Sequence, residues 1–533
     1  NKFDAEELDV PVINGIIDNY MNRTEYEASS RPLPSDKMMK LDLQELWGAI
    51  DPVIMAATEV DSETETETSV SIDYQVDWLV DRVESWVNLS EIPESDKKVA
   101  VIYYNHGGGK DNIGASYLDV IPSLSNLLGA MAKDGYSLNE NQTLNETELL
   151  NLMLTQGINI GTWAPGELQK MVDTGKVVLL PESTYEKWFS ELPEERQREV
   201  IDQWGPAPGK IMVWENETGK YLVIPRIEVG KNVILAPQPS RGWLDDNEAL
   251  YHDNDLPPHH QYIAFYLWLQ HSEEEGGFGS DALVHFGRHG TQEWLPGKEF
   301  GLSRYDWSSL MIGDKPVIYP YVMDGLGEGN EAKRRGGAVI VDHLVPPIIS
   351  AGSYGNYSNL SEAIQNYEQA EADASLKAAH RSEILNLTKS LSLDEEFNMT
   401  EAENNETYFN TTFLEGLEDL LEEYKSQSMP YGLHVLGTSP KGEQLAGMVN
   451  SMLGTDFADS VNEFNETEGA QLYLLDLVLN QGVNSTAAQK QVLGKSNENV
   501  STFLSNAEDY AANLSLGEEE IDQVLNALDG KFI

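Results

Sequence analysis

Lys98-Val-Ala-Val-Ile-Tyr-Tyr104 is followed directly by Asn105-His-Gly-Gly-Gly-Lys-Asp-Asn-Ile-Gly114, and then by apolar residues at helical spacing from Leu118 to Met131. A short apolar run bounded by a glycine-rich segment is typical of a buried strand, and the spacing after it is typical of an amphipathic helix. Strand, glycine loop and helix together form the basic α/β unit, whose loop end commonly carries a ligand site. This stretch therefore predicts an α/β protein.

Other short apolar runs repeat the pattern along the chain and alternate with segments of helical periodicity. The predicted strands are Val177–Leu180, Ile211–Trp214, Tyr221–Ile224, Val233–Ala236, Ala282–His285, Val317–Tyr321 and Ala338–Val341. The second and third of these flank a polar turn at 215–220 and predict a hairpin. From residue 361 onward, apolar residues fall mainly at helical spacing.

These patterns predict an α/β fold of several layers with parallel-type sheets, followed by a mainly helical C-terminal region. At 533 residues the chain exceeds the size at which one hydrophobic core stops growing, so we expect more than one domain. We predict an N-terminal helical and linker region at 1–97, an α/β core that carries the motifs at 98–350, and a mainly helical, glycan-rich region at 351–533.

The composition excludes some classes of partner. A net charge of -54 makes nucleic acid an unlikely partner, and it suits either a saline medium or a field that concentrates divalent cations. No apolar run reaches the roughly 18 residues of a membrane helix, so we expect no membrane span. The absence of cysteine excludes thiolate metal sites and disulfides.

Fifteen Asn-x-Ser/Thr triplets are spread over the chain and crowd its polar segments. They begin at Asn22, Asn88, Asn141, Asn145, Asn216, Asn356, Asn359, Asn386, Asn398, Asn405, Asn410, Asn465, Asn484, Asn499 and Asn513. Such triplets are acceptor sites for N-glycans in exported proteins. They predict a glycosylated protein outside the cell or at its surface, and we take the start without methionine as a sign of processing. The alternative is a cytoplasmic protein whose Asn- and Thr-rich composition generates the triplets.

Two histidines and one glutamate recur every four residues in Ala282-Leu-Val-His-Phe-Gly-Arg-His-Gly-Thr-Gln-Glu-Trp-Leu-Pro-Gly-Lys298. The predicted strand delivers His285, and the turn after Gly287 would let His289 and Glu293 converge on one pocket. Neutral imidazole binds divalent metals, and imidazole or carboxylate can accept protons. The spacing alone leaves open a structural interpretation, in which the histidines are hydrogen-bonded at a sheet corner.

A second candidate is the cationic run Lys333, Arg334 and Arg335, which follows a glycine-rich segment. In so acidic a chain these cations suit the capture of ligand carboxylates, because the arginine fork matches a carboxylate. The alternative is an internal salt-bridge network with Glu328 and Glu331. The Gly107–Lys110 loop would likewise hold an anion on backbone N–H groups. It is not a nucleotide-binding P-loop, since no G-x4-G-K-[ST] pattern occurs.

A third candidate is Tyr251-His-Asp-Asn-Asp-Leu-Pro-Pro-His-His-Gln-Tyr262. His252 with Asp253 and Asp255 has the residue types of a metal or proton-relay site. The two prolines equally favour a rigid start of the following helix, with His259 and His260 in its first turn. Both interpretations stay open, and His252 joins the candidate metal ligands.

Ordered motifs from about residue 98 to 440 resemble the large subunits of cobaltochelatase and magnesium chelatase. Besides the segments around His252 and His285, they are Lys110-Asp-Asn-Ile-Gly-Ala-Ser-Tyr-Leu-Asp119, Trp204-Gly-Pro206, Gln238-Pro-Ser-Arg-Gly242, Ile318-Tyr-Pro-Tyr321, Gly327-Glu-Gly329, Ala332-Lys-Arg-Arg335, Ala338-Val-Ile-Val-Asp-His-Leu-Val-Pro-Pro347 and Gly432-Leu-His-Val-Leu-Gly437.

The resemblance implies a tetrapyrrole and a Co, Ni or Mg ion as substrates or ligands, in cobalamin-type biosynthesis. It implies His285, His289 and Glu293 as catalytic and metal-binding residues. By the same likeness, Lys110, Arg241, Lys333, Arg334 and Arg335 are expected to bind the ring.

The resemblance also predicts separate ATP-hydrolysing AAA+ subunits as partners, with no ATP site in this chain. Two features depart from the family: this chain is much shorter than its members, and His106-Gly-Gly-Gly109 replaces a proline-containing stretch. The sequence is therefore compatible with three functions. They are metal insertion as a chelatase, capture of a tetrapyrrole or metal by an exported protein without catalysis, and a structural role in an extracellular layer or filament with self-association.

Overall fold

The structure is a computed structural model in which two compact units are described separately. It describes residues 9–105, 113–138, 145–162, 164–242, 253–287, 290–346, 348–350, 356–370, 374–391, 393, 397, 399–414, 416–417, 421, 428–430, 432–465, 467, 470–481 and 498–533. The first unit comprises 1–345, 433–439 and 516–533, and the second comprises 346–432 and 440–515. The predicted boundaries at 97 and 350 remain a prediction.

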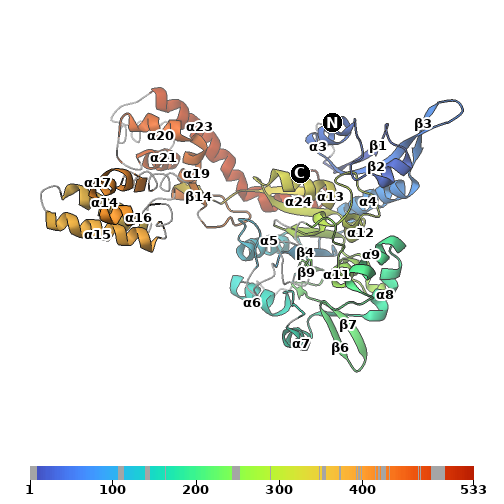
Figure 1. The fold of residues 1–533 in the computed structure, drawn as a ribbon. Coiled ribbons are helices and arrows are strands. Elements are labelled where there is room, and N and C mark those ends of the chain that lie inside the picture. The colour runs from blue at the N-terminus through green and yellow to red at the C-terminus, as the bar shows by residue number, and fades with distance from the viewer. Residues whose placement is uncertain are drawn as a thin grey trace. The chain divides into compact units, whose positions relative to one another are not determined.

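A six-stranded sheet forms the centre of the first unit, in the order β12-β11-β10-β4-β9-β8 (Figure 1). Its strands are β4 (Val99–Tyr103), β8 (Ile227–Glu228), β9 (Val233–Pro237), β10 (Ala282–Phe286), β11 (Val317–Val322) and β12 (Ala338–His343). All neighbours pair in parallel except β8, which is antiparallel to β9. The predicted parallel α/β core is therefore confirmed.

Alternate residues of these strands enter two different hydrophobic clusters, because successive side chains point to opposite faces of a strand. One cluster joins Ala100, Ile102 and Leu283 to α11 (His260–Gln270) and α12 (Trp307–Ile312). The other joins Val99 and Val101 to α5 (Val120–Asp134) and α24 (Glu520–Leu528). Both faces are covered, which explains why the strands are apolar without alternation.

A second, antiparallel sheet has the order β5-β7-β6, with β5 (Val178–Pro181), β6 (Val213–Asn216) and β7 (Gly219–Ile224). It contains the predicted hairpin, with Val213 paired to Leu222. The helices α7 (Pro165–Asp173), α8 (Glu182–Ser190) and α9 (Glu194–Trp204) share a hydrophobic cluster with this sheet, whereas α6 (Glu146–Gln156) contacts α5 and β8.

The N-terminal layer differs from its prediction as a helical and linker region. It contains a three-stranded sheet of β1 (Val12–Ile17), β2 (Ala49–Val60) and β3 (Glu67–Ser71), with α2 (Arg23–Ala28), η1 (Met38–Asp42), α3 (Leu43–Leu46) and α4 (Asp73–Glu91). The helical expectation fails at β2 because most of that strand is buried. A continuous apolar run cannot be told from a buried helix by periodicity alone.

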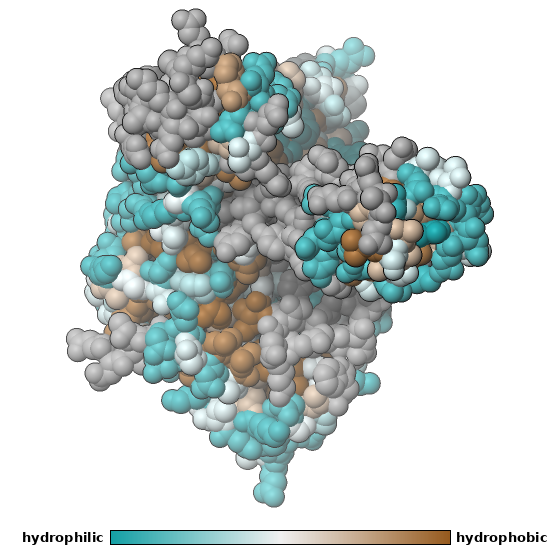
Figure 2. Space-filling view, turned by 90° about the vertical axis from the view of Figure 1, so that its left-hand side faces the viewer, coloured by the Kyte–Doolittle hydropathy of each residue, from teal (hydrophilic) through white to brown (hydrophobic). Residues whose placement is uncertain are grey.

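The second unit is mainly helical, as predicted. Its described elements are β13 (Ile348–Ser350), α14 (Asn356–Gln369), α15 (Ala374–Ser390), α16 (Met399–Asn404), α17 (Glu406–Tyr408), η4 (Phe409–Phe413), β14 (Ser428–Pro430), α19 (Glu443–Leu453), α20 (Thr455–Asn462), α21 (Ala470–Gln481) and α23 (Glu498–Ser515). None of the helices within the described ranges has the length and apolar character that a membrane crossing requires. Hydrophilic residues cover much of the described surface in Figure 2, and hydrophobic ones gather in patches.

Two segments of the first unit come from late in the sequence. His434 in 433–439 and Glu520 at the start of α24 are both buried, and the His434 Nε2 atom lies 2.8 Å from Glu520 Oε2. The Glu520 carboxylate also accepts hydrogen bonds from the backbone N–H groups of Leu344 and Gly437, each at 2.8 Å. Glu520 thus joins β12 to both late segments.

Candidate functional site

The carboxyl end of β10 positions the first candidate residue, His285. Gly287 follows at a φ of 86°, and a Cβ atom there would lie 2.2 Å from the Ala115 side chain, so only glycine fits this turn. After residues 288–289, which lie outside the described residues, Thr291 leads into the short helix η3 (Gln292–Trp294). This helix returns Glu293 to the end of the sheet.

His285, Glu293 and Tyr319 converge beside Gly290. A Cβ atom placed on Gly290 would lie 2.9 Å from His285 Nδ1, 2.9 Å from the Tyr319 hydroxyl and 3.0 Å from Glu293 Oε2. Tyr319, in β11, donates a hydrogen bond to Glu293 Oε1 at 3.2 Å and accepts one from the Gly290 N–H. The structure therefore brings two of the three predicted catalytic residues together.

Burial shifts the pKa of both of these groups. His285 and Glu293 are each 1% exposed. Burial raises the pKa of Glu293 to about 7, a shift that its hydrogen bonds and Arg335 oppose. Burial lowers the pKa of His285 to about 3, so its imidazole is neutral. The Nε2 atom of His285 and the Oε2 atom of Glu293 have no hydrogen-bond partner among the described residues.

A network of hydrogen-bonded side chains beside His285 and Glu293 was not predicted from the sequence. The Gln238 side chain donates to Thr291 Oγ1 at 3.0 Å and accepts from the Tyr266 hydroxyl at 2.8 Å. The Tyr262 hydroxyl lies 2.8 Å from the same Thr291 oxygen. The Tyr266 ring is nearly parallel to the His285 ring, with 6.4 Å between centroids. Position offered one signal: Gln238 directly follows β9, at the same sheet edge as His285.

Arg241 lies in the loop after β9 and is 4% exposed. Its Nη2 group donates to the carbonyl oxygens of Asp253 at 2.8 Å and Leu256 at 3.0 Å. Its Nε and Nη1 atoms are buried without partners among the described residues. Burial lowers its pKa, while the charges of Tyr262, Asp253 and Glu293 act in the opposite direction. This cation is therefore close enough to Glu293 to sense its charge.

Two of the other predicted cations, Arg334 and Arg335, have partners within the protein. Arg334 binds Glu45 Oε2 at 2.6 Å and Asp42 Oδ1 at 2.9 Å. Arg335 donates to the Leu295 carbonyl and lies 3.9 Å from Glu331 Oε2, the pairing that the salt-bridge interpretation contains. Lys333 is half-buried on the same helix, α13 (Leu326–Gly336). A ring-binding role for these three residues remains a prediction.

Three candidates, His289, His252 and Lys110, lie outside the described residues. Within the described part of the chain, no group of three or more His, Asp or Glu side chains has the geometry to hold a metal. The side chain of Asp253, next to His252, holds the local backbone. Its Oδ1 atom accepts hydrogen bonds from the N–H groups of Asp255 at 2.9 Å and Leu256 at 3.1 Å.

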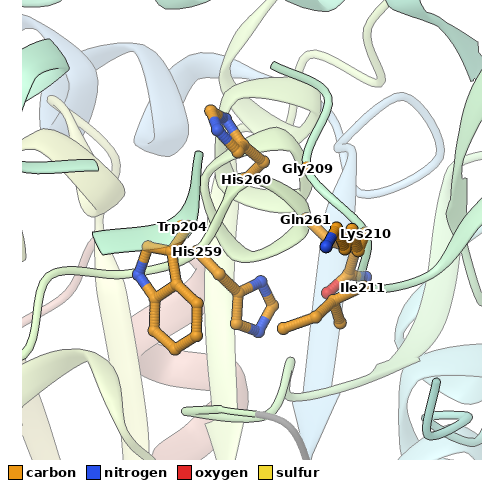
Figure 3. Close-up of a pocket in the computed structure, with 7 residues that line it drawn as sticks. All are labelled: Trp204, Gly209, Lys210, Ile211, His259, His260 and Gln261. Atoms are coloured by element: carbon orange, nitrogen blue, oxygen red, sulfur yellow. The ribbon is translucent and has the colours of Figure 1, made fainter. Parts of the chain in front are cut away.

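His259 and His260 support the start of α11, the second of the two interpretations left open. His259 Nδ1 accepts a hydrogen bond from the Tyr262 N–H at 3.2 Å, and its Nε2 lies 2.8 Å from the Ser240 carbonyl. His260 bonds the Tyr185 hydroxyl and the Gly205 carbonyl, both at 2.8 Å. Figure 3 shows the small cavity beside them, whose volume of about 10 Å³ suits roughly one water molecule.

Comparison with known proteins finds relatives of this chain by sequence and by fold. The chain is 32% identical to the uncharacterized protein MJ0908 of Methanocaldococcus jannaschii, over 99% of this chain and 44% of that protein. It is 32% identical to the aerobic cobaltochelatase subunit CobN of Pseudomonas aeruginosa, over 81% of this chain and 34% of that subunit.

The catalytic subunit of cobaltochelatase from Mycobacterium tuberculosis has a similar fold, with a TM-score of 0.84 and 28% identity. The match covers 99% of this chain and 45% of that one, so this chain spans less than half the length of these relatives. The family model of CobN/Magnesium Chelatase matches residues 1–533. The chain belongs to the CobN/magnesium chelatase family.

Proposed function

We propose that this chain binds a tetrapyrrole and a divalent metal ion at the carboxyl edge of its parallel sheet, as the substrate-binding part of a metal chelatase. The observation that carries the proposal is the convergence of His285 Nδ1, Glu293 Oε2 and the Tyr319 hydroxyl on one point beside Gly290. Ligands of open α/β sheets bind at this edge, outside the carboxyl ends of the strands.

The chemistry of insertion matches these groups. When it receives a divalent ion, a porphyrin loses two protons from its nitrogens and a corrin-type ring loses one, so a nearby base is needed. With a pKa of about 7, Glu293 exists in both protonation states at neutral pH, which is the condition for efficient proton transfer. The neutral His285 ring has Nδ1 towards Glu293 and Tyr319, and its other nitrogen, Nε2, has no partner in the described part of the chain and would be the donor for the metal substrate.

The surroundings suit a flat ring that carries carboxylates. The buried rings of Tyr266 and Tyr319 pack beside the His285 ring, with 6.4 and 5.3 Å between ring centroids. Arg241 has buried N–H groups without described partners, and a ligand carboxylate would satisfy them in the bidentate geometry that arginine favours. We assign ring binding to Arg241 before Arg334, because Asp42 and Glu45 already engage the Arg334 guanidinium.

The activity of a complete chelatase is a wider proposal. The chain spans 34% of the CobN relative, so catalysis would require the remaining parts of such a protein and separate ATP-hydrolysing subunits. The proposal for this chain is therefore binding of the ring and metal. Cobalt and a corrin-type ring are the first choice, with nickel or magnesium and a porphyrin as the alternatives.

Ring binding is tested by titrating the purified chain with hydrogenobyrinic acid and with a water-soluble porphyrin that carries carboxylates. We expect a shift of the ring's visible absorbance and quenching of tryptophan fluorescence. Glu293→Gln and His285→Ala should each weaken binding of ring or metal about tenfold or more, a loss of about 1.4 kcal/mol, while thermal unfolding stays cooperative. The absence of a shift with either ring would refute the proposal.

Export and glycosylation form a separate proposal, which rests on the fifteen triplets. The structure gives some of their asparagines a second role. Asn22, Asn145 and Asn405 cap the starts of α2, α6 and α17. Asn216 and Asn465 accept hydrogen bonds from the backbone N–H two residues ahead. Mass spectrometry of the native protein would decide between glycan attachment and capping as the reason for these triplets.

A further inference from the structure

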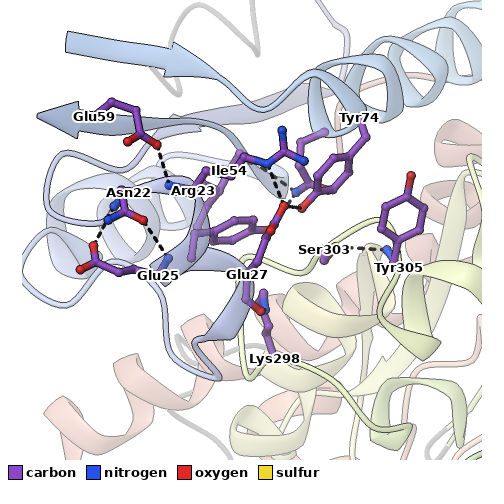
Figure 4. A network of polar contacts seen from close by, with 12 residues as sticks. Asn22, Arg23, Glu25, Glu27, Ile54, Glu59, Tyr74, Lys298, Ser303 and Tyr305 are labelled. Atoms are coloured by element: carbon purple, nitrogen blue, oxygen red, sulfur yellow. Dashed lines mark hydrogen bonds and ion pairs between the residues drawn. The ribbon is translucent and has the colours of Figure 1, made fainter. Parts of the chain in front are cut away.

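Lys298 is the last residue of the motif that contains Glu293, and its ammonium group is buried against backbone carbonyl groups. The residue is 6% exposed, and its Nζ atom donates to the carbonyl oxygens of Glu27 and Ser29, both at 3.0 Å. These carbonyls lie at the C-terminal end of α2, where the helix dipole favours a cation. The Nζ atom also lies 5.2 Å from the centre of the Tyr26 ring. Figure 4 shows Lys298 directed towards Glu27.

The residues after Lys298 continue this attachment to the N-terminal layer. The Glu299 N–H donates to the Ser30 carbonyl at 2.9 Å. The Tyr26 hydroxyl lies 3.1 Å from the Leu302 carbonyl, and the Gln75 side chain donates to the same carbonyl at 3.0 Å. Gln75 also accepts from the Arg304 N–H at 2.7 Å. The loop 298–304 is thus bonded to α2 and α4 along its length.

The stretch between Glu293 and Lys298 has little freedom to absorb a displacement. The Gln292 carbonyl accepts from the Ser308 hydroxyl at 2.6 Å, and the Leu295 carbonyl accepts from Arg335. Gly297 has a φ of 151°, and a Cβ atom there would lie 2.9 Å from Asp306. A shift of Lys298 would therefore be passed along a tightly held loop to Glu293.

Stability alone does not explain a buried lysine at this position. Removing an ammonium ion from water costs several kcal/mol, and an apolar residue of similar volume is often as stable or more stable. Lys298 is compensated by two carbonyls and a ring, and burial still lowers its pKa. Its contacts specify where the loop sits, because only a cation of this reach satisfies both carbonyls at the end of α2.

We infer that Lys298 is a positioning residue, which fastens the loop carrying Glu293 to the N-terminal layer so that this layer sets the geometry of the site. The inference rests on the proposed function for its consequence in ring binding. The attachment itself is independent of that function and is measured separately.

The experiment compares the full chain with Lys298→Met, Lys298→Arg and Arg31→Gln. The last variant is the matched control, because it removes the neighbouring exposed ion pair between Arg31 and Glu299 at 2.6 Å. Backbone hydrogen exchange is followed by mass spectrometry in peptides covering 290–296, 282–286 and 317–322. Binding of the soluble porphyrin is measured in parallel.

We expect Lys298→Met to accelerate exchange in 290–296 about tenfold while the two strand peptides keep their protection. It should also weaken porphyrin binding about tenfold, whereas Lys298→Arg restores most of both properties and Arg31→Gln changes neither. Tyr26→Phe, which removes the hydroxyl beside the Leu302 carbonyl, should produce a smaller change of the same kind and replaces Lys298→Met if that variant does not fold.

Unchanged exchange in 290–296, or equal acceleration in all three peptides, would overturn the inference. If the wild-type chain binds neither ring, the proposed function fails, and the exchange data still decide whether Lys298 holds the loop. If the wild type binds and Lys298→Met alters exchange without altering binding, the positioning role is refuted.

Discussion

Replacement of Glu520 by alanine provides a sharp test of how the late segments are held in the first unit. The carboxylate contacts His434 Nε2 at 2.8 Å and accepts hydrogen bonds from the N–H groups of Leu344 and Gly437, each also at 2.8 Å. Both side chains of the Glu520 and His434 pair are 4% exposed. The stacked ring of His343, 5.4 Å from that of His434, closes one side of the pair.

The magnitude follows from what the substitution leaves behind. Removing the carboxylate leaves the buried His434 Nε2 atom without its hydrogen-bond partner, at a cost of about 1–3 kcal/mol. Each buried N–H group that loses its acceptor adds about 1–3 kcal/mol, which water entering the vacated space partly offsets. We therefore expect Glu520→Ala to lower the free energy of unfolding of the first unit by about 3–5 kcal/mol. Glu520→Gln keeps an acceptor oxygen and should lose less.

The composition of the chain supplies a selective assay. All 11 tryptophans lie between Trp47 and Trp307, inside the first unit, so their fluorescence during urea unfolding reports on that unit alone. Glu519→Ala is the matched control, because this neighbouring glutamate is exposed. A loss below about 1 kcal/mol for Glu520→Ala, or an equal loss for Glu519→Ala, would refute the assignment of the carboxylate as the anchor of both late segments.

Three further variants test other parts of the structure. Gly290→Ala places a methyl group within 3.0 Å of three polar atoms of the proposed site, so ring or metal binding should fall at least about tenfold. The control is Gly327→Ala, where the added methyl meets nothing within 4 Å. Equal binding by the two variants would contradict the proposed site. Burial lowers the pKa of His259 to about 3, below its ordinary value of 6.5, so the unfolded chain binds more protons between these values and stability falls as pH falls through that window. His259→Asn keeps the helix cap and should reduce the slope of stability against pH by about 1.4 kcal/mol per pH unit between pH 6 and 4, and an unchanged slope would contradict the neutral cap. Asn145→Ala, in protein made without glycosylation, should lose about 1 kcal/mol of unfolding free energy while Asn145→Asp retains it, and equal losses would refute capping by Asn145.

The central sheet could be predicted because its strands are short apolar runs that end in turns. The runs beginning near Val99, Val233, Ala282, Val317 and Ala338 all became parallel strands of one sheet. Parallel strands place their carboxyl ends at one edge, so the polar residues that follow them were bound to meet. That is why His285, in β10, and Glu293, in the short helix η3 that follows, could be paired from the sequence.

The other parts of the fold and of the candidate site could not be predicted, because they depend on contacts between segments that are distant in the sequence. Nothing in the sequence signals that 516–533 returns to the first unit, since an amphipathic helix does not specify its partner. Tyr262 and Tyr319 were missed because tyrosine within an apolar helix or strand also fits an ordinary core. Arg334 resembled a ligand-binding residue in sequence, yet its partners, Asp42 and Glu45, come from the N-terminal layer.

Charge balance is the physical reason why the proposed metal insertion is compatible with a site this buried. A dry pocket strongly disfavours a change in net charge, because an ion loses its hydration there. For a porphyrin, exchange of its two inner protons for one divalent ion leaves the charge of the ring unchanged, so only the protons in transit need a temporary carrier; a corrin-type ring gives up one proton, and its metal complex gains one positive charge. Glu293, with a pKa of about 7, can take up a proton as easily as it releases one, and neutral His285 adds no charge of its own. A lysine or an unperturbed aspartate in the place of Glu293 or His285 would keep a fixed charge next to the ring. Such a charge would oppose either the arrival of the metal ion or the release of the protons.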